Sequence, residues 1–154
     1  MATMNVLIPY NFTVHDGKAV EFAVNVFSHL EDVRVTLFHT YIPVPQIDMT
    51  GSPELGKMKS GLLYLTEEIR KKEAGLNAAL HYLERSGFPR SHLDFILKKR
   101  ERSTIDEIIA AILEGHYKIV VLSITPGKVS RLFARSLHDQ LMNAVKEIVV
   151  CVAT

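Results

Sequence analysis

The feature that most constrains the fold is an apolar strand followed by a short loop and a helix. Residues 119–122 (Ile-Val-Val-Leu) are followed by Ser-Ile-Thr-Pro-Gly-Lys at 123–128, and a helical pattern starts near Ser130. Open α/β sheets bind ligands at such turns, and a loop that cradles phosphate needs glycines so that its N–H groups can approach the anion. This loop has one glycine, and Pro126 has no N–H to donate. The turn predicts a nucleotide-type fold with a degenerate phosphate loop.

Apolar periodicity along the rest of the chain predicts strands that alternate with helices. We expect strands at 4–8, 33–39, 93–97, 119–122 and 148–152, and helices at about 15–30, 59–86, 103–113 and 131–145. Ser103 is a good N-cap, and Gly115 is expected to end that helix. Residues 41–58, with three prolines and two glycines, are expected to form a long loop. The alternation predicts one α/β domain over residues 1–154, a three-layer α/β/α arrangement with a five-stranded parallel sheet of flavodoxin or Rossmann-like type.

Composition narrows the possible classes of protein. A chain of 154 residues that is 47% hydrophobic suits one domain with a real core. A net charge of +1 calls for neither nucleic acid nor an anionic membrane as partner. Cys151 is the single cysteine and cannot form an internal disulfide. Because no membrane span or signal peptide is visible in the sequence, we expect a cytoplasmic protein.

Several segments, taken in order, resemble the universal stress protein family. Ile-Pro-Tyr-Asn-Phe-Thr at 8–13 is similar to the family's first strand and its Pro-x-Asp ending, and Leu-Phe-His-Thr at 37–40 is similar to the Leu-His-Val ending of its second strand. Residues 103–109 resemble the segment after the third strand, and residues 146–152 resemble the terminal strand without its common Pro-Cys-Pro entry. The resemblance covers nearly the whole chain. It implies a flavodoxin-like sheet, a role in stress response, and a homodimer paired through the strand from Ile148 to Val152.

The family's ATP-binding members carry Gly, two residues, Gly, nine residues, then Gly-Ser or Gly-Thr. Laid on this chain, the first glycine falls on Ser123, the second on Pro126 or Gly127, and the final pair near Arg135 and Ser136. Only Gly127 and Ser136 match in kind, and Asn11 stands where the family has an acidic residue. ATP is therefore a possible cofactor, but the resemblance favours a degenerate nucleotide cleft.

The resemblance also implies where a ligand would lie. Asn11 would hydrogen-bond adenine or ribose, and the main chain near Thr40 would meet the base. The amides after Leu122 and the Ser136 hydroxyl would hold phosphates. The candidate site thus consists of Pro9, Asn11, Thr40, Leu122, Ser123, Gly127 and Ser136.

No catalytic or metal site is expected. Ser136, His138 and Asp139 are close neighbours on one helix, and residues one and two apart on a helix do not face each other. The seven histidines lack the spacing of a metal motif. His39, at the end of a strand, either lines a ligand site or is a structural histidine.

Two segments have open interpretations. The basic run 98–102 either attracts phosphate or a nucleic-acid backbone, or is a solvated loop, since Glu101 interrupts it. Met49, Leu55, Met58 and Leu62 either form a patch that binds a partner or pack the long loop onto the second helix.

Three functions follow as hypotheses. The first is a dimeric binding or regulatory module of stress response without turnover chemistry; its apolar last strand would be covered by pairing across a two-fold axis. The second is an ATP-binding switch or weak ATPase. The third is a pure interaction protein whose 41–60 and 98–102 loops contact a partner.

Overall fold

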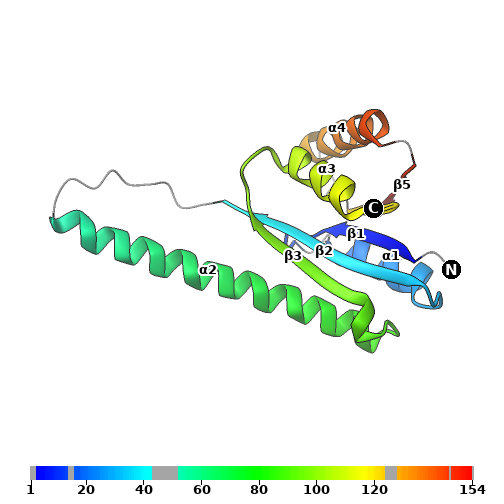
Figure 1. The fold of residues 1–154 in the computed structure, drawn as a ribbon, viewed down its shortest axis with the longest axis horizontal. Helices are drawn as coiled ribbons and strands as arrows, with labels where there is room; N and C mark the ends of the chain where they lie inside the picture. Colours follow the sequence, from blue (N-terminus) through cyan, green and yellow to red (C-terminus); the bar gives the residue numbers. More distant parts are fainter. Residues whose placement is uncertain (1–2, 14–15, 43–51, 124–127, 146, 154) are drawn as a thin grey trace.

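The computed structural model describes residues 3–13, 16–42, 52–123, 128–145 and 147–153 of the chain (Figure 1). Strands and helices alternate along these residues, with a short 3-10 turn η1 at Arg90–His92 before the third strand. The strands are β1 (Met4–Pro9), β2 (Val33–Tyr41), β3 (Leu93–Lys99), β4 (Ile119–Ser123) and β5 (Val149–Ala153). The helices are α1 (Asp16–Phe27), α2 (Ser52–Arg85), α3 (Thr104–Gly115) and α4 (Lys128–Ala144).

The strands form one parallel sheet in the order β3-β2-β1-β4-β5. The chain steps outward from β1 to β3, then crosses back to β4 and continues to β5 on the other side. Because such crossovers are right-handed, α1 and α2 cover one face of the sheet and α3 and α4 the other, as Figure 1 shows. The predicted three-layer fold with a five-stranded parallel sheet is confirmed. The reversal of direction places the switch point between β1 and β4.

Two apolar cores lie on the two faces of the sheet. One joins buried residues of β1 and β2 to α1 and to Leu76, Leu80 and Leu83 of α2. The other joins β1 and β4 to Ile108 and Ile112 of α3 and to Leu137 and Leu141 of α4. The central strands are buried on both sides, as their continuous apolar runs predict.

Most element boundaries shift by one to three residues from the predicted ones, and the largest difference lies at the start of α2. Helix α2 begins at Ser52, so the expected loop over 41–58 is wrong for residues 52–58; residues 43–51 lie outside the described chain. Pro53 misled the prediction because it falls in the first helical turn, where its missing N–H removes no hydrogen bond. Helix α4 begins at Lys128 rather than 131, and β5 spans Val149–Ala153 rather than 148–152.

Helix α3 begins and ends close to the predicted residues. The Ser103 hydroxyl accepts a hydrogen bond from the Asp106 N–H at 3.1 Å, which confirms the predicted N-cap. At the other end His116, rather than Gly115, takes the left-handed conformation, with φ of 53°. Within the described residues, no helix combines the length and apolar character needed to cross a membrane.

The basic run at the end of β3 binds a buried carboxylate of α3. The Glu107 side chain is fully buried, with Lys98 Nζ 2.8 Å from Oε2 and Arg102 Nε 3.3 Å from Oε1. Contact with the Lys98 ammonium, supported by Arg102, holds the pKa of Glu107 below its ordinary value, although burial opposes this shift. Arg100 donates to the Thr104 hydroxyl at 3.3 Å. These cations therefore have intramolecular partners, and the run is neither a free phosphate site nor simply a solvated loop.

We expect Glu107→Gln to lower the free energy of unfolding by about 2 kcal/mol, since it removes charged hydrogen bonds in a buried setting. Because the folded pKa lies below the unfolded value, the carboxylate stabilises the fold above about pH 4.5, and this contribution is lost as pH falls through the folded pKa. Urea unfolding between pH 3 and pH 7, roughly the range that spans a carboxyl titration, should therefore show a steeper acid loss in the wild type than in the variant. Glu101→Gln, an exposed change of equal charge, is the control; equal losses in both variants would contradict the role of Glu107.

Candidate ligand site at the sheet switch point

A buried carboxylate occupies the switch point, at the carboxyl ends of β1 and β4, where open α/β sheets bind ligands. Asp16, the first residue of α1, is 2% exposed. Among the described residues its side chain accepts four hydrogen bonds. Oδ2 accepts from the Asn11 N–H, the Thr13 N–H and the Thr13 hydroxyl, each at 2.9 Å, and Oδ1 accepts from the Ser123 hydroxyl at 2.7 Å. One side chain thus joins the loop after β1, the start of α1 and the end of β4.

Asp16 is not among the site residues predicted from the sequence. The spacing between Thr13 and Asp16 is the sequence pattern that indicates a local bond between them. Thr-x-x-Asp resembles the spacing of a capping box, in which an acidic side chain reaches back three residues to a backbone N–H. The bond from the Thr13 N–H to Asp16 has this geometry. The additional bond to Ser123 spans 107 residues, and no local pattern predicts it.

An aromatic cluster fills the space beside this carboxylate. Phe12 has a left-handed backbone, with φ of 62°, and its ring makes edge contacts with Tyr10 at 5.0 Å and with His39 at 4.9 Å between centroids. Lys72 Nζ of α2 lies 4.6 Å from the centre of the Phe12 ring, a cation–π geometry. A Cβ at Gly75 would lie 2.5 Å from Phe12 Cε1. The Gly75 position, a weak point for a helix, thus provides the space into which Phe12 packs.

His39 is a structural histidine with a defined tautomer. Its Nδ1 lies 2.8 Å from the Tyr10 carbonyl, and because a carbonyl only accepts, Nδ1 carries the proton when the ring is neutral. Burial, chiefly, and also Lys72 lower the pKa of His39, while the Tyr10 carbonyl and Asp16 oppose this shift. Of the two interpretations of His39, the structure shows the structural one. Burial, followed by the charge of Asp16, raises the pKa of Tyr10.

Four of the predicted site residues lie at the carboxyl edge of the sheet. Pro9 is buried at the end of β1 and Thr40 is half-buried near the end of β2. Asn11 has an exposed side chain, and its N–H is bonded to Asp16. The hydroxyl of Ser123 is bonded to the same carboxylate. Asp16 thus joins the Asn11 main chain to the Ser123 side chain.

The other predicted site residues are Leu122, Ser136 and Gly127. Leu122 is 5% exposed, in the core beneath α3 and α4. Ser136 lies eight positions after Lys128, the start of α4, roughly 12 Å along the helix, and its hydroxyl accepts from Gln140 Nε2 at 3.2 Å. Gly127 lies outside the described residues. Most of the nine-residue spacer in the predicted phosphate motif is therefore helical.

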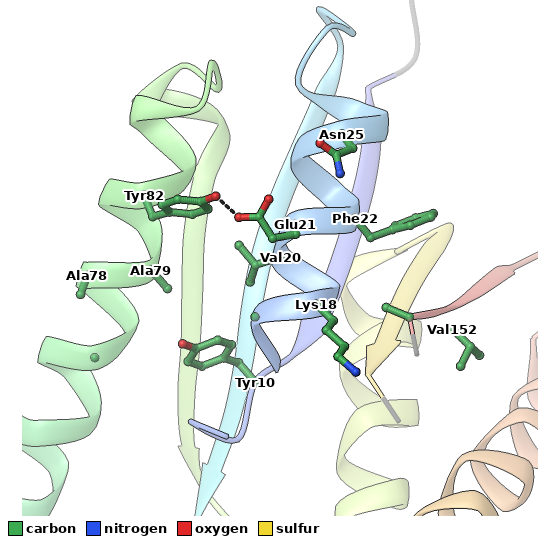
Figure 2. A pocket seen from close by; sticks show the side chains of 13 residues that line it. Tyr10, Lys18, Val20, Glu21, Phe22, Asn25, Ala78, Ala79, Tyr82 and Val152 are labelled. Atoms are coloured by element: carbon green, nitrogen blue, oxygen red, sulfur yellow. Dashed lines mark hydrogen bonds between the residues drawn. The ribbon is translucent and has the colours of Figure 1, made fainter. Parts of the chain in front are cut away.

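An open groove runs along α1 (Figure 2). It has a volume of about 1010 Å³ and lies between α2 and β5. Small residues of α2, Gly75, Ala78 and Ala79, line one side, and Val152 and Ala153 of β5 line the other. The Tyr82 hydroxyl donates to a Glu21 carboxylate oxygen across the gap between α2 and α1, as Figure 2 shows. No local sequence pattern predicts this groove, because its walls come from three separate elements.

The catalytic alternatives find no support in the geometry. His138 Nδ1 lies 3.4 Å from Asp139 Oδ1 on an exposed part of α4, while the Ser136 hydroxyl is bonded to Gln140. Among the described residues no cluster of histidine, cysteine and acidic side chains could hold a metal ion. Burial raises the pKa of the Cys151 thiol, which makes it less reactive.

Comparison with solved structures finds proteins of the same architecture. UspA, a universal stress protein from Lactobacillus plantarum, superposes with a TM-score of 0.67 at 16% identity, over 100% of this chain and 99% of that one. A universal stress protein from Archaeoglobus fulgidus in complex with dAMP gives 0.63 at 16% identity, over the whole of both chains. This is the universal stress protein fold. An Arabidopsis thaliana protein of the same family with AMP bound gives a TM-score of 0.58 at 13% identity, over 98% of this chain and 92% of that one.

The likeness to universal stress proteins lies in structure and not in sequence. No model of a protein family matches the chain, and no curated protein matches it in sequence. The resemblance read from the sequence is confirmed at the level of the fold.

We expect Asp16→Ala to lower the free energy of unfolding by about 2–3 kcal/mol, because it leaves four half-buried donors without their acceptor. Ser123→Ala, which breaks one of these bonds, should cost about 1 kcal/mol. Asp139→Ala, at an exposed site on α4, is the control. Denaturant unfolding measures all three, and an Asp16→Ala effect no larger than that of Asp139→Ala would show that the carboxylate does not organise this edge.

Proposed function

We propose that the chain is a universal stress protein-like module, one domain over residues 1–154, that acts as a cytoplasmic homodimer in stress response. It binds or regulates a partner, has no turnover chemistry of its own, and its nucleotide cleft does not hold ATP. The shared fold supports the family assignment. The buried Asp16 carboxylate at the switch point is the observation that carries the functional part of the proposal.

Repulsion between like charges disfavours a phosphate next to Asp16. A carboxylate and a phosphate oxygen about 4 Å apart repel by roughly 4 kcal/mol at the effective dielectric of a protein surface. A triphosphate brings more negative charge to this edge than a monophosphate does. Asp16 therefore disfavours ATP at the point where the strand order reverses.

Within the part of the chain that the structure describes, the donors of Asn11, Thr13 and Ser123 already have an internal partner. Anion sites at helix N-termini use free backbone N–H groups, but the N–H groups of Asn11 and Thr13 are bonded to Asp16. The Ser123 hydroxyl is bonded to the same carboxylate. A phosphate would have to displace an existing acceptor that is itself charged and buried.

A nucleotide with less charge is the second candidate. Solved structures with this fold have dAMP, AMP or cAMP bound, and the exposed side chain of Asn11 would contact the ribose or base. In that case Asn11 and the main chain near Thr40 hold the nucleoside, and the nucleotide acts as a switch. The predicted phosphate ligands, Ser123, Gly127 and Ser136 together with the amides after Leu122, remain part of this alternative.

Isothermal titration of the purified chain separates the two candidates. We expect no saturable binding of Mg-ATP at low-micromolar concentrations, and Asp16→Asn should raise the ATP affinity by tenfold or more because it removes the repulsive charge. Asp139→Asn, which removes an equal charge at an exposed position, should leave the affinity unchanged. Low-micromolar ATP binding that is lost on Asn11→Ala or Ser136→Ala would overturn the proposal in favour of the ATP switch.

The dimer part of the proposal rests on the exposed edge strand β5. Val149 and Val152 are 57% and 45% exposed, and an apolar edge strand without a cover is prone to pair with other chains. Pairing of the segment from Ile148 to Val152 across a two-fold axis covers both copies at once.

We expect Val152→Lys to weaken this dimer by at least tenfold in dissociation constant, since a charge at the pairing edge opposes close approach of the strands. Val26→Lys, an exposed apolar position on α1, is the matched control. Sedimentation equilibrium measures both, and an unchanged dimer in Val152→Lys would rule out this interface.

A further inference from the structure

The ring of Phe12 lies in a socket built by the loop after β1, by β2 and by α2. The Tyr10 and His39 rings meet it edge to face, with centroids 5.0 and 4.9 Å away and interplanar angles of 78° and 81°. From α2, Lys72 Nζ lies 4.6 Å from the ring centre, and Gly75 borders the ring edge. These four residues, here called the ring socket, contact one flat side chain from separate parts of the sequence.

The ring socket has features that select a flat, electron-rich ring. The face of an aromatic ring carries partial negative charge, so an ammonium such as that of Lys72 is attracted to it, and neighbouring aromatic edges favour contact with it. A Cβ at position 75 would lie 2.5 Å from Phe12 Cε1, so glycine leaves the space that the ring needs. A saturated ring of the same size is thicker and lacks this charge distribution.

Placing Phe12 in the socket carries two local conformational costs. Its backbone is left-handed, with φ of 62°, a conformation that bulky residues rarely adopt. Gly75 lies inside α2, where alanine would favour the helix more. Strained residues of this kind cluster at sites that bind ligands. The ring is also only half-buried, so it can leave the socket without crossing the core.

The main chain around Phe12 is held independently of its ring. The N–H groups of its two neighbours, Asn11 and Thr13, donate to the Asp16 carboxylate. Rotation about the side-chain bonds of Phe12 can therefore empty the socket while the loop keeps these hydrogen bonds.

The open groove along α1 borders the ring socket. Tyr10 and Gly75 belong to the socket and also line the groove, and Figure 2 shows the Tyr10 side chain at this position. A small molecule in the groove can therefore reach the socket without any change in the packing of the sheet.

We propose that the ring socket is a binding site for a small, uncharged aromatic molecule, and that Phe12 occupies this site until such a molecule displaces it. The ligand takes over the edge contacts of Tyr10 and His39 and the cation contact of Lys72. The displaced Phe12 side chain then moves to the surface, beside the edge that Asp16 organises. This site goes beyond the proposed function, since it requires neither a phosphate group nor a dimer.

Binding of phenol and cyclohexanol to a Phe12→Ala variant tests the proposal, because the two probes share one skeleton and differ in aromaticity. We expect isothermal titration to show phenol binding about tenfold tighter in Phe12→Ala than in the wild type, since the variant has no occupant to displace. The variant should prefer phenol to cyclohexanol by about fivefold, as expected for a cation over the ring face. Adding Lys72→Met should abolish this preference.

Phe88→Ala is the matched control, because it removes a phenylalanine that is 2% exposed in the same apolar core but is not part of the ring socket. It should show no preference for phenol. Equal affinity of Phe12→Ala for the two probes, or equal phenol binding by the two alanine variants, would overturn the proposal.

The wild-type chain provides a check that does not depend on the folding of a variant. In nuclear magnetic resonance spectra the Phe12 and His39 rings are close enough to give nuclear Overhauser cross-peaks. At saturating phenol we expect these cross-peaks to disappear and phenol to His39 cross-peaks to replace them. If the Phe12 to His39 cross-peaks persist, the socket is not a ligand site. That result would leave the proposed function intact, because its own test uses ATP and Asp16→Asn.

Discussion

The carboxylate of Asp16 is the interaction on which the arrangement of this edge depends. A buried charge is tolerated in a protein only when hydrogen bonds replace the water it has lost. Here the replacements come from the loop after β1 and from Ser123 at the end of β4. The two strands that flank the switch point are thereby joined through one side chain, and the start of α1 is fixed against both. The same bonds leave the site with a fixed negative charge.

This use of polar groups for internal bonds recurs along the carboxyl edge of the sheet. Lys98 at the end of β3 and Arg102 after it form ion pairs with Glu107. The imidazole of His39 donates to the Tyr10 carbonyl. The aromatic ring of Phe12 occupies the space between Tyr10, His39 and α2. Each of these groups would suit a ligand if it were free. Because the fold itself engages them, these groups are not free to bind a ligand while these contacts hold.

Strand β5 presents exposed valines at one side of the sheet. An apolar edge strand is prone to pair with another chain, and pairing across a two-fold axis would cover both copies at once.

The sequence by itself determined the class of fold, because strands buried on both faces and amphipathic helices differ in apolar period, and their alternation leaves few topologies. It also located the helix cap at Ser103 and, through the Thr-x-x-Asp spacing, contained the local part of the Asp16 site. Only the tertiary structure decided what the polar residues do. The bond from Ser123 to Asp16, the ion pairs of Glu107, and the packing of Phe12 against Gly75 each join segments that a local pattern treats separately. A hydrogen bond or contact between distant segments depends on where the sheet brings them, and residue type and spacing do not encode that position.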